Sequence, residues 1–276
     1  MNRIKRNDRI GAMVKILTDR PNHIYPLNYF SEMFQTAKST ISEDIAIIKN
    51  RLNRFELGDL ETVVGAAGGV RFIPKFCGSK ACSFIEEICK QLSTPDRILP
   101  GGFIYMTDIL YSPQITQRFG EILASQFYDC EPDFVITVET KGIPIAMMTA
   151  RALNCPVVVA RRDNKVTEGS SVSINYVSAS SKRIQTMTLV KRAVKEGQKG
   201  LIIDDFMKGG GTARGLMDLM SEFNADIVGV GVAISTDEPE KKMVDSYKSL
   251  MVLKEVDEEN RTILVEPASW IKDLKK

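Results

Sequence analysis

The sequence is poor in the residues from which most catalytic and metal centres are built. His23 is the only histidine in 276 residues, and it lies in the turn between Pro21 and Pro26, which favours a plain surface residue over a catalytic or metal-binding one. The cysteines never occur in the Cys-x-x-Cys spacing of zinc and redox sites. We therefore expect no metal centre, and reduced, mostly buried thiols at Cys77, Cys82, Cys89, Cys130 and Cys155.

Long apolar runs are also missing. No stretch approaches the roughly 18 consecutive apolar residues of a membrane span, and the charged start, residues 1–6, is followed by no apolar segment of the kind found in secretory signals. We expect a cytoplasmic protein with no membrane partner. The length, with 43% hydrophobic and 26% charged residues, suits one large globular domain plus a small one.

The net charge is also small, +2, but it is unevenly divided between the N-terminal part and the rest of the chain. Residues 1–75 hold 12 basic and 8 acidic residues, a net charge of +4, which leaves −2 for the rest of the chain. A polyanionic partner for the N-terminal part is one explanation. A solvated basic face without a partner is the other, and the charge alone does not choose between them.

The first 75 residues contain three patterns typical of short helices. Residues 9–17 place apolar side chains at i, i+3, i+4 and i+7, on one helical face. A second, aromatic-rich segment covers residues 27–34, and residues 35–38 form a tight connection. A third helix is expected to start near Thr40, which with Glu43 has the spacing of a capping box. Its apolar stripe is Ile41, Ile45, Ile48 and Leu52.

Two strand-like stretches follow the three helices. Residues 61–64 and 70–73 are short and β-branched or aromatic, and the glycine-rich residues 65–69 between them supply the positive φ angles of a hairpin loop. Three helices and a hairpin predict a winged helix-turn-helix, a DNA-binding domain over residues 1–74. A second domain is expected over residues 75–276.

In the second domain, strand patterns alternate with helix patterns after an initial helix at residues 81–92. Such alternation is typical of an α/β domain with a mainly parallel sheet and helices on both faces. The expected strands are residues 103–106, 134–138, 157–160, 201–203, 227–233 and 250–253. The expected helices are residues 114–127, 145–153, 213–223 and 241–247.

One segment of this domain has the features of a sugar-phosphate site. A buried strand runs into Asp204-Asp205-Phe206-Met207-Lys208, and Gly209-Gly210-Gly211-Thr212 follows where a helix is expected to start. Glycines let the backbone approach a phosphate, amides at a helix start attract it, and carboxylates can accept hydrogen bonds from ribose hydroxyls. The alternative is a turn that uses glycine for geometry alone, but two adjacent buried carboxylates would then be costly.

This pattern of a strand, two aspartates, four residues and Gly-Gly-Thr resembles the motif with which type I phosphoribosyltransferases bind phosphoribosyl pyrophosphate (PRPP). Thr140-Lys141-Gly142, after the strand at 134–138, resembles the pyrophosphate loop of that family, with Lys141 facing the pyrophosphate. Residues 161–176 resemble its mobile flap. A common turn and an ordinary charged loop are the alternatives for these two segments. In the flap, the candidates to neutralise pyrophosphate oxygens are Arg161, Arg162 and Lys165.

The chain also departs from the enzyme pattern. Active enzymes usually carry Thr-Gly-Gly-Thr in the phosphate loop, and Gly209 replaces the first threonine here. Phe206, Met207 and Lys208 would crowd an incoming base if they project toward the sugar. No base-recognition segment is evident in residues 253–270. We therefore expect PRPP with Mg²⁺ to bind as an effector, with no catalytic residue and no required cofactor. An active purine phosphoribosyltransferase with a regulatory N-terminal domain is the alternative.

Over essentially its whole length, the chain resembles the purine operon repressors of Gram-positive bacteria. The resemblance implies a homodimer that represses purine-synthesis genes, leaves operator DNA when PRPP binds, and has no transferase activity. It also implies guanosine tetraphosphate as a further ligand of the same pocket, with Phe103, Tyr105, Phe206 and Lys208 as candidates to hold it. The segments that carry the resemblance include residues 73–74, 97–102, 140–144, 163–170 and 202–208.

The third helix has the polar N-terminal turn of a recognition helix, the end that meets base edges in the major groove. Basic residues around it would contact phosphates, which gives affinity and salt dependence but little sequence choice. A docking module for a protein partner is the alternative. The predicted DNA-binding residues are Lys38, Ser39, Thr40, Ser42 and Lys49 on this helix, and Arg3, Lys5, Arg6, Arg51, Arg54 and Arg71 for phosphates.

Overall fold

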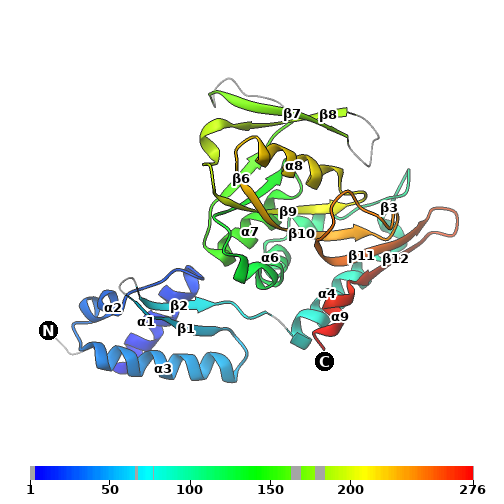
Figure 1. Cartoon of the computed structure of the whole chain (residues 1–276). Coiled ribbons are helices and arrows are strands. Elements are labelled where there is room, and N and C mark those ends of the chain that lie inside the picture. The colour runs from blue at the N-terminus through cyan, green and yellow to red at the C-terminus, as the bar shows by residue number, and fades with distance from the viewer. Residues whose placement is uncertain (1–3, 66–67, 77, 163–168, 178–183, 276) are drawn as a thin grey trace. The chain divides into compact units, whose positions relative to one another are not determined.

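The computed structural model describes residues 4–65, 68–76, 78–162, 169–177 and 184–275. It divides into two compact units, one of Met1–Phe76 with Arg151–Asn154, the other of Cys77–Ala150 with Cys155–Lys276 (Figure 1). Of the described cysteines, Cys82 and Cys89 are buried, Cys130 and Cys155 are partly buried, and all four are free thiols. Within the described ranges, no helix combines the length and apolar character needed to cross a bilayer.

The N-terminal unit is a winged helix-turn-helix, as the sequence predicts. Three helices enclose a small apolar core that includes Met13, Phe30 and Ile41, and an antiparallel hairpin closes it. The hairpin pairs Glu61 with Arg71 across its two strands. The elements are α1 (Arg6–Asp19), α2 (Leu27–Met33), α3 (Lys38–Arg54), β1 (Asp59–Val63) and β2 (Gly69–Ile73).

The predicted capping box at the start of α3 is wrong. The helix begins at Lys38 after Ala37, whose backbone is extended, and no side chain caps it. Thr40 is therefore already inside the first turn, where its hydroxyl no longer occupies the capping position. Glu43 instead accepts a hydrogen bond from Arg6 Nη2 at 2.8 Å. The carboxylate thus ties α3 to α1, a use that local spacing does not reveal.

A six-stranded sheet in the order β12-β11-β10-β9-β5-β6 organises the second unit. All neighbouring strands are parallel except β12, which pairs antiparallel with β11 at one edge. The prediction of a mainly parallel sheet is confirmed. Its strands are β5 (Phe134–Val138), β6 (Val157–Ala160), β9 (Lys199–Met207), β10 (Asp226–Thr236), β11 (Lys248–Asp257) and β12 (Thr262–Pro267).

Both faces of this sheet are covered. On one face, Val230 and Val232 of β10 join a core cluster with residues of α8. On the other face, Cβ atoms at Gly229 and Gly231 would lie 2.6 Å and 3.1 Å from the ring of Phe127 in α6, so glycine allows close packing of that helix. The helices of this unit are α4 (Gly78–Leu92), α5 (Thr107–Leu110), α6 (Pro113–Phe127), α7 (Ile143–Leu153), α8 (Gly211–Ser221) and α9 (Ser269–Asp273).

A second hairpin, β7 (Ser171–Val177) with β8 (Ile184–Val190), lies beside α8 (Figure 1). Only its first strand overlaps residues 161–176, the segment that resembles a mobile flap, and the sequence patterns predicted neither strand. Tyr176 of β7 packs over Gly215 of α8, where a Cβ would lie 2.9 Å from the tyrosine ring. The hairpin is thereby anchored on the helix that follows the phosphate loop.

Two predicted elements of the second unit are wrong. The strand expected at 103–106 is reduced to β4 (Phe103–Ile104), which pairs with β3 (Ile98–Leu99) in a separate small sheet. The helix expected at 241–247 does not form. In that segment Lys242 turns inward and the Met243 amide donates to Gly209 O at 2.8 Å, so tertiary hydrogen bonds replace the helical ones.

Candidate functional site: a phosphate loop beside an acidic pair

The glycine-rich loop joins the end of β9 to the start of α8. Gly210 has φ 81°, the left-handed conformation that favours glycine, and it directly precedes the first helical residue, Gly211. A small cavity of about 60 Å³ lies over the loop. Its lining consists of Asp204, Val232 and residues 206–213. A helix start, a bent glycine loop and a small cavity together suit one phosphate group.

Asp204 and Asp205 lie side by side at the carboxyl end of β9. The Asp205 amide donates to Asp204 Oδ1 at 2.9 Å. Burial, followed by the charge of Asp205, raises the pKa of Asp204 well above its usual value, and the nearby Arg162 opposes this shift. Within the described ranges, no three Asp, Glu, His or Cys side chains gather as a metal site. The pair is therefore suited to hydroxyl groups, or to a cation that the ligand also holds.

The predicted pyrophosphate loop packs directly against this acidic pair. A Cβ at Gly142 would lie 2.5 Å from Thr137 Oγ1 and 2.8 Å from Asp204 Oδ1, so position 142 has no room for a side chain. The peptide between Glu139 and Thr140 is cis. Lys141 and Arg162 are exposed at the cavity beside the acidic pair. Lys141 of this loop and Arg162, which follows β6, therefore lie with the two carboxylates of β9 at one edge of the sheet.

A larger cavity of about 340 Å³ opens between these loops. One wall is the segment 101–106, whose Gly102 amide donates to Glu258 Oε1 at 2.6 Å. The β7–β8 hairpin supplies another wall through Tyr176, whose hydroxyl donates to Gln185 Oε1 at 2.8 Å. This volume suits a small molecule with one apolar and several charged parts.

The structure brings most of the predicted effector-binding residues together. Gly142 packs behind Asp204, and Met207 is buried in the core while also bordering the small cavity. The larger cavity is lined by Phe103, Thr140, Lys141, Arg162, Asp204, Asp205, Phe206, Lys208 and Thr212, and the smaller one by Gly209, Gly210 and Gly211.

Two predicted residues are placed differently, and a third is not described. Arg161 forms an antiparallel bridge with Thr188, and its backbone is used in that pairing. Tyr105 is not part of the lining of the larger cavity, and its carbonyl accepts a hydrogen bond from Arg97 Nη1 at 2.9 Å. Lys165 lies outside the described residues.

Sequence reasoning missed eight side chains that line the larger cavity, those of Ile104, Met106, Val138, Glu139, Tyr176, Gln185, Thr236 and Leu253. Thr236 and Leu253 belong to β10 and β11, and Thr236 is the last residue of its strand. Because the carboxyl ends of parallel strands meet at one edge, a polar residue at the end of β10 was a signal that could have been used. Tyr176 and Gln185 come from opposite strands of the unpredicted hairpin, and no local pattern marks them.

The predicted DNA-binding residues fall into two groups in the N-terminal unit. Lys38, Ser39 and Ser42 are exposed at the N-terminal end of α3, and Thr40 is half-buried. Three cations are held by carboxylates: Arg6 by Glu43 at 2.8 Å, Arg71 by Glu61 at 2.7 Å, and Lys49 more loosely by Asp59 at 3.9 Å.

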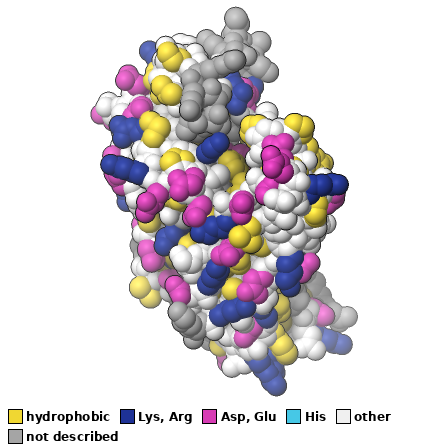
Figure 2. All heavy atoms as spheres, turned by 90° about the vertical axis from the view of Figure 1, so that its right-hand side faces the viewer, with side chains coloured by type: hydrophobic (Ala, Val, Ile, Leu, Met, Phe, Trp, Pro, Cys, Tyr) yellow, Lys and Arg dark blue, Asp and Glu magenta, His cyan; other side chains and the backbone are white. Residues whose placement is uncertain are grey.

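The remaining predicted cations that the structure describes are not held in this way. Lys5, Lys38 and Arg51 form no ion pair with any residue that the structure describes. Arg54 lies over the ring of Phe55, and Arg3 is outside the described residues. On the face of the molecule in Figure 2, basic and acidic side chains are interspersed.

The fold and the site define a class: a phosphoribosyltransferase-type α/β domain joined to a helix-turn-helix domain. Residues 5–74 match the family described as "Bacterial purine repressor, N-terminal", and residues 106–270 match the phosphoribosyl transferase domain. The adenine phosphoribosyltransferase of Saccharomyces cerevisiae has a similar fold, with TM-score 0.52 and 18% identity over 60% of this chain and 97% of that chain.

Curated relatives identify the family. The purine biosynthesis transcriptional repressor PurR of Bacillus subtilis is 46% identical over 273 residues, which are 99% of this chain and 96% of that protein. The purine biosynthesis transcriptional activator PurR of Lactococcus lactis is 40% identical over 270 residues, 98% of this chain and 100% of that protein. The chain belongs to this family of bacterial purine biosynthesis transcriptional regulators.

Proposed function

We propose that this chain represses purine biosynthesis genes by binding operator DNA through α3, and that PRPP bound in the second unit releases it. The observation that carries the proposal is the presence, in one chain, of a helix-turn-helix and a cavity with an acidic pair and a phosphate loop. The 46% identity to a repressor along nearly the whole chain supports the same conclusion.

The charges around the cavity suit each part of PRPP. The small cavity over Gly209–Gly211 would take the 5-phosphate, and the Asp204–Asp205 pair would accept the ribose hydroxyls. Lys141 and Arg162 would meet the pyrophosphate. Mg²⁺ fits this arrangement, since it is usually held by one or two carboxylates together with ligand phosphates and water.

The second part of the proposal is that the protein binds PRPP without transferring its phosphoribosyl group to a base. Gly209 stands where active enzymes usually carry a threonine, so the phosphate loop lacks that hydroxyl donor. Phe206 and Lys208 line the space that a base would need. The protein mixed with PRPP, Mg²⁺ and each purine base in turn should release no pyrophosphate beyond the base-free background. Base-dependent release would favour a purine phosphoribosyltransferase with a regulatory domain. Guanosine tetraphosphate is a proposed competitor of PRPP in the same cavity, to be measured by displacement.

Operator release is the direct test. In a gel-shift experiment at low salt, saturating PRPP with Mg²⁺ should dissociate the complex between the protein and a DNA fragment from upstream of a purine biosynthesis gene. Ribose 5-phosphate at the same concentration serves as a control that lacks the pyrophosphate. A complex that persists at saturating PRPP would rule out the inducer role.

The sign of regulation and the oligomeric state need separate measurements. The named relatives include a repressor and an activator, so transcripts should be measured in cells with and without the gene, where repression predicts a rise on deletion. We propose a homodimer, because a palindromic or tandem operator presents two equivalent half-sites. Sedimentation of the protein at the concentrations used for DNA binding checks this state.

A further inference from the structure

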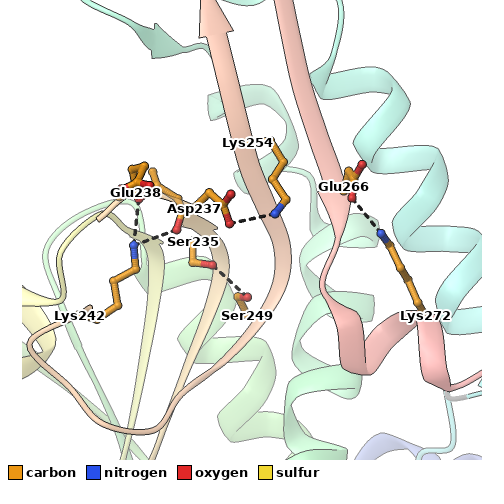
Figure 3. A network of polar contacts seen from close by, with 9 residues as sticks. Ser235, Asp237, Glu238, Lys242, Ser249, Lys254, Glu266 and Lys272 are labelled. Carbon is orange, nitrogen blue, oxygen red and sulfur yellow. Dashed lines mark hydrogen bonds and ion pairs between the residues drawn. The ribbon is translucent and has the colours of Figure 1, made fainter. Parts of the chain in front are cut away.

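Lys242 is a buried cation in the segment between β10 and β11. Its neighbours Lys241 and Met243 are exposed, but only 8% of Lys242 is accessible. Its Nζ donates to Lys208 O at 2.7 Å, to Thr236 O at 2.8 Å and to Thr236 Oγ1 at 3.3 Å. Figure 3 shows the side chain extending toward the residues at the end of β10. All three acceptors belong to residues that line the ligand cavity.

The same segment also holds the next peptide of the phosphate loop. The Met243 amide donates to Gly209 O at 2.8 Å, and a Cβ at Gly210 would lie 3.2 Å from Met243 N. The hydroxyl of Thr236 lies within hydrogen-bond distance of Lys208 O, at 3.1 Å, and shares its one proton between this carbonyl and that of Glu238. Two successive carbonyls of the loop, those of Lys208 and Gly209, are therefore fixed from one side.

Because the peptide group is planar, fixing these two carbonyls also fixes the directions of the amides that follow them. In a trans peptide the C=O and the following N–H point in opposite directions. Because the Lys208 carbonyl points at Lys242, the Gly209 amide must point away from it, and the Gly210 amide is likewise directed away from Met243. Both glycines line the small cavity where a phosphate would bind.

The burial of this ammonium has a cost that its contacts must offset. Burial lowers the pKa of Lys242, while the charges of Asp237 and Glu238 act in the opposite direction. Asp237 is itself paired with Lys254 at 2.9 Å (Figure 3). The hydrogen-bond acceptors of the Lys242 ammonium are thus neutral oxygens, and among the described residues the carboxylates act on it only from a distance.

We propose that Lys242 is a positioning residue of the phosphate site: it holds the Lys208 and Thr236 carbonyls so that the loop amides face a phosphomonoester. The proposal rests on the proposed function, since it concerns the same site. It assigns Lys242 to the sugar-phosphate end of the ligand. The pyrophosphate end, at Lys141 and Arg162, should be independent of it.

The test compares three ligands and two lysines by titration calorimetry. Lys242→Met removes the buried ammonium at nearly constant length, and Lys254→Met removes a neighbouring ammonium on β11 as a matched control. For Lys242→Met, ribose 5-phosphate and PRPP should bind about tenfold more weakly, the usual effect of losing hydrogen bonds from a charged group. Pyrophosphate should bind within about twofold of wild type, since no loop amide is needed for it. Lys254→Met should leave the affinity for all three ligands unchanged.

A second variant guards against a Lys242 substitution that damages the fold. Thr236→Val keeps the shape of the side chain and removes the hydroxyl beside Lys208 O. It should lower the affinity for ribose 5-phosphate about threefold and leave the affinity for pyrophosphate unchanged.

Unchanged ribose 5-phosphate binding in both variants would overturn the inference. An equal loss of affinity for ribose 5-phosphate and for pyrophosphate would overturn it as well, because it would mean general damage to the fold. A wild-type protein that binds neither PRPP nor ribose 5-phosphate would overturn the proposed function, and the inference with it.

Discussion

The N-terminal unit and the ligand cavity of the second unit differ in how their positive charges are paired. In the N-terminal unit half of the described Lys and Arg side chains are held by carboxylates, and Arg9 is even buried against Asp44 at 2.8 Å. Around the ligand cavity, Lys141, Arg162 and Lys208 form no ion pair with a residue that the structure describes, although three carboxylates, those of Glu139, Asp204 and Asp205, also line it. The other N-terminal cations with carboxylate partners are Arg6, Lys15, Lys49, Arg71 and Lys75.

The comparison distinguishes cations that stabilise the fold through ion pairs from cations that are available to bind a ligand. A paired cation contributes to tertiary structure, and a DNA phosphate must compete with its carboxylate. An unpaired cation at a cavity is available for a ligand from the start. By this criterion, Lys38 and Arg51 on α3 are stronger candidates for DNA contacts than Arg6 or Arg71, which the sequence analysis ranked together with them.

The largest expected effect comes from removing the acidic pair. Asp204→Ala combined with Asp205→Ala should lower PRPP affinity about 100-fold or more, because two hydrogen-bonding carboxylates are lost. Operator affinity without PRPP should stay within about twofold of wild type, because the substitutions lie in the other unit. Calorimetry with PRPP and gel shifts with operator DNA measure the two quantities. Parallel loss of both would break the division of roles between the units.

The reciprocal change concerns the recognition helix. Lys38→Ala combined with Ser42→Ala should weaken operator binding about 10- to 50-fold, since each removes a contact to a phosphate or a base edge. PRPP affinity should not change. Lys15→Ala is a matched control, because Lys15 is an exposed cation on α1 that is paired with Asp19. If the control weakens DNA binding as much as the double variant does, α3 is not the reading element.

A smaller effect is expected from Gly142→Ala. The new Cβ would lie 2.5 Å from Thr137 Oγ1 and 2.8 Å from Asp204 Oδ1, so the carboxylate or the loop must shift. PRPP affinity should fall about tenfold, the usual cost of a misplaced charged contact. Gly197→Ala supplies a control of the same chemistry, at a glycine where a Cβ meets nothing within 4 Å. Its φ of 79° costs stability, but its distance from the cavity should leave PRPP affinity intact.

The smallest expected effect is on stability and follows from the raised pKa of Asp204. The folded protein keeps the Asp204 proton to higher pH than the unfolded chain does, so wild-type stability falls as the pH rises above the unfolded value of about 3.9. Asp204→Asn removes this loss and should raise the free energy of unfolding at pH 7 by about 1 kcal/mol, at the expense of PRPP binding. Urea denaturation at pH 7 and at pH 4 measures it. A variant that is less stable at pH 7 would contradict the burial argument.

Local patterns in the sequence predicted most of the elements correctly. The apolar spacing of α1 and α3 and the buried runs of β5, β6 and β9 each lie within a few consecutive residues, so periodicity alone identifies them. The Asp204–Asp205 pair and the glycine loop were likewise visible, because the strand, the acids and the glycines are contiguous. Helix 241–247 was mispredicted because the inward turn of Lys242 depends on acceptors that are distant in the chain.

The sequence by itself determined the two-domain plan and the place of the sugar-phosphate site at the end of β9. Only the tertiary structure decided which charges are paired, which walls close the cavity and what holds the phosphate loop. The physical reason is sequence separation: Lys242 reaches Lys208 across 34 residues, and Glu258 reaches Gly102 across 156. Contacts of this range depend on how the strands are ordered in the sheet, which no local pattern encodes.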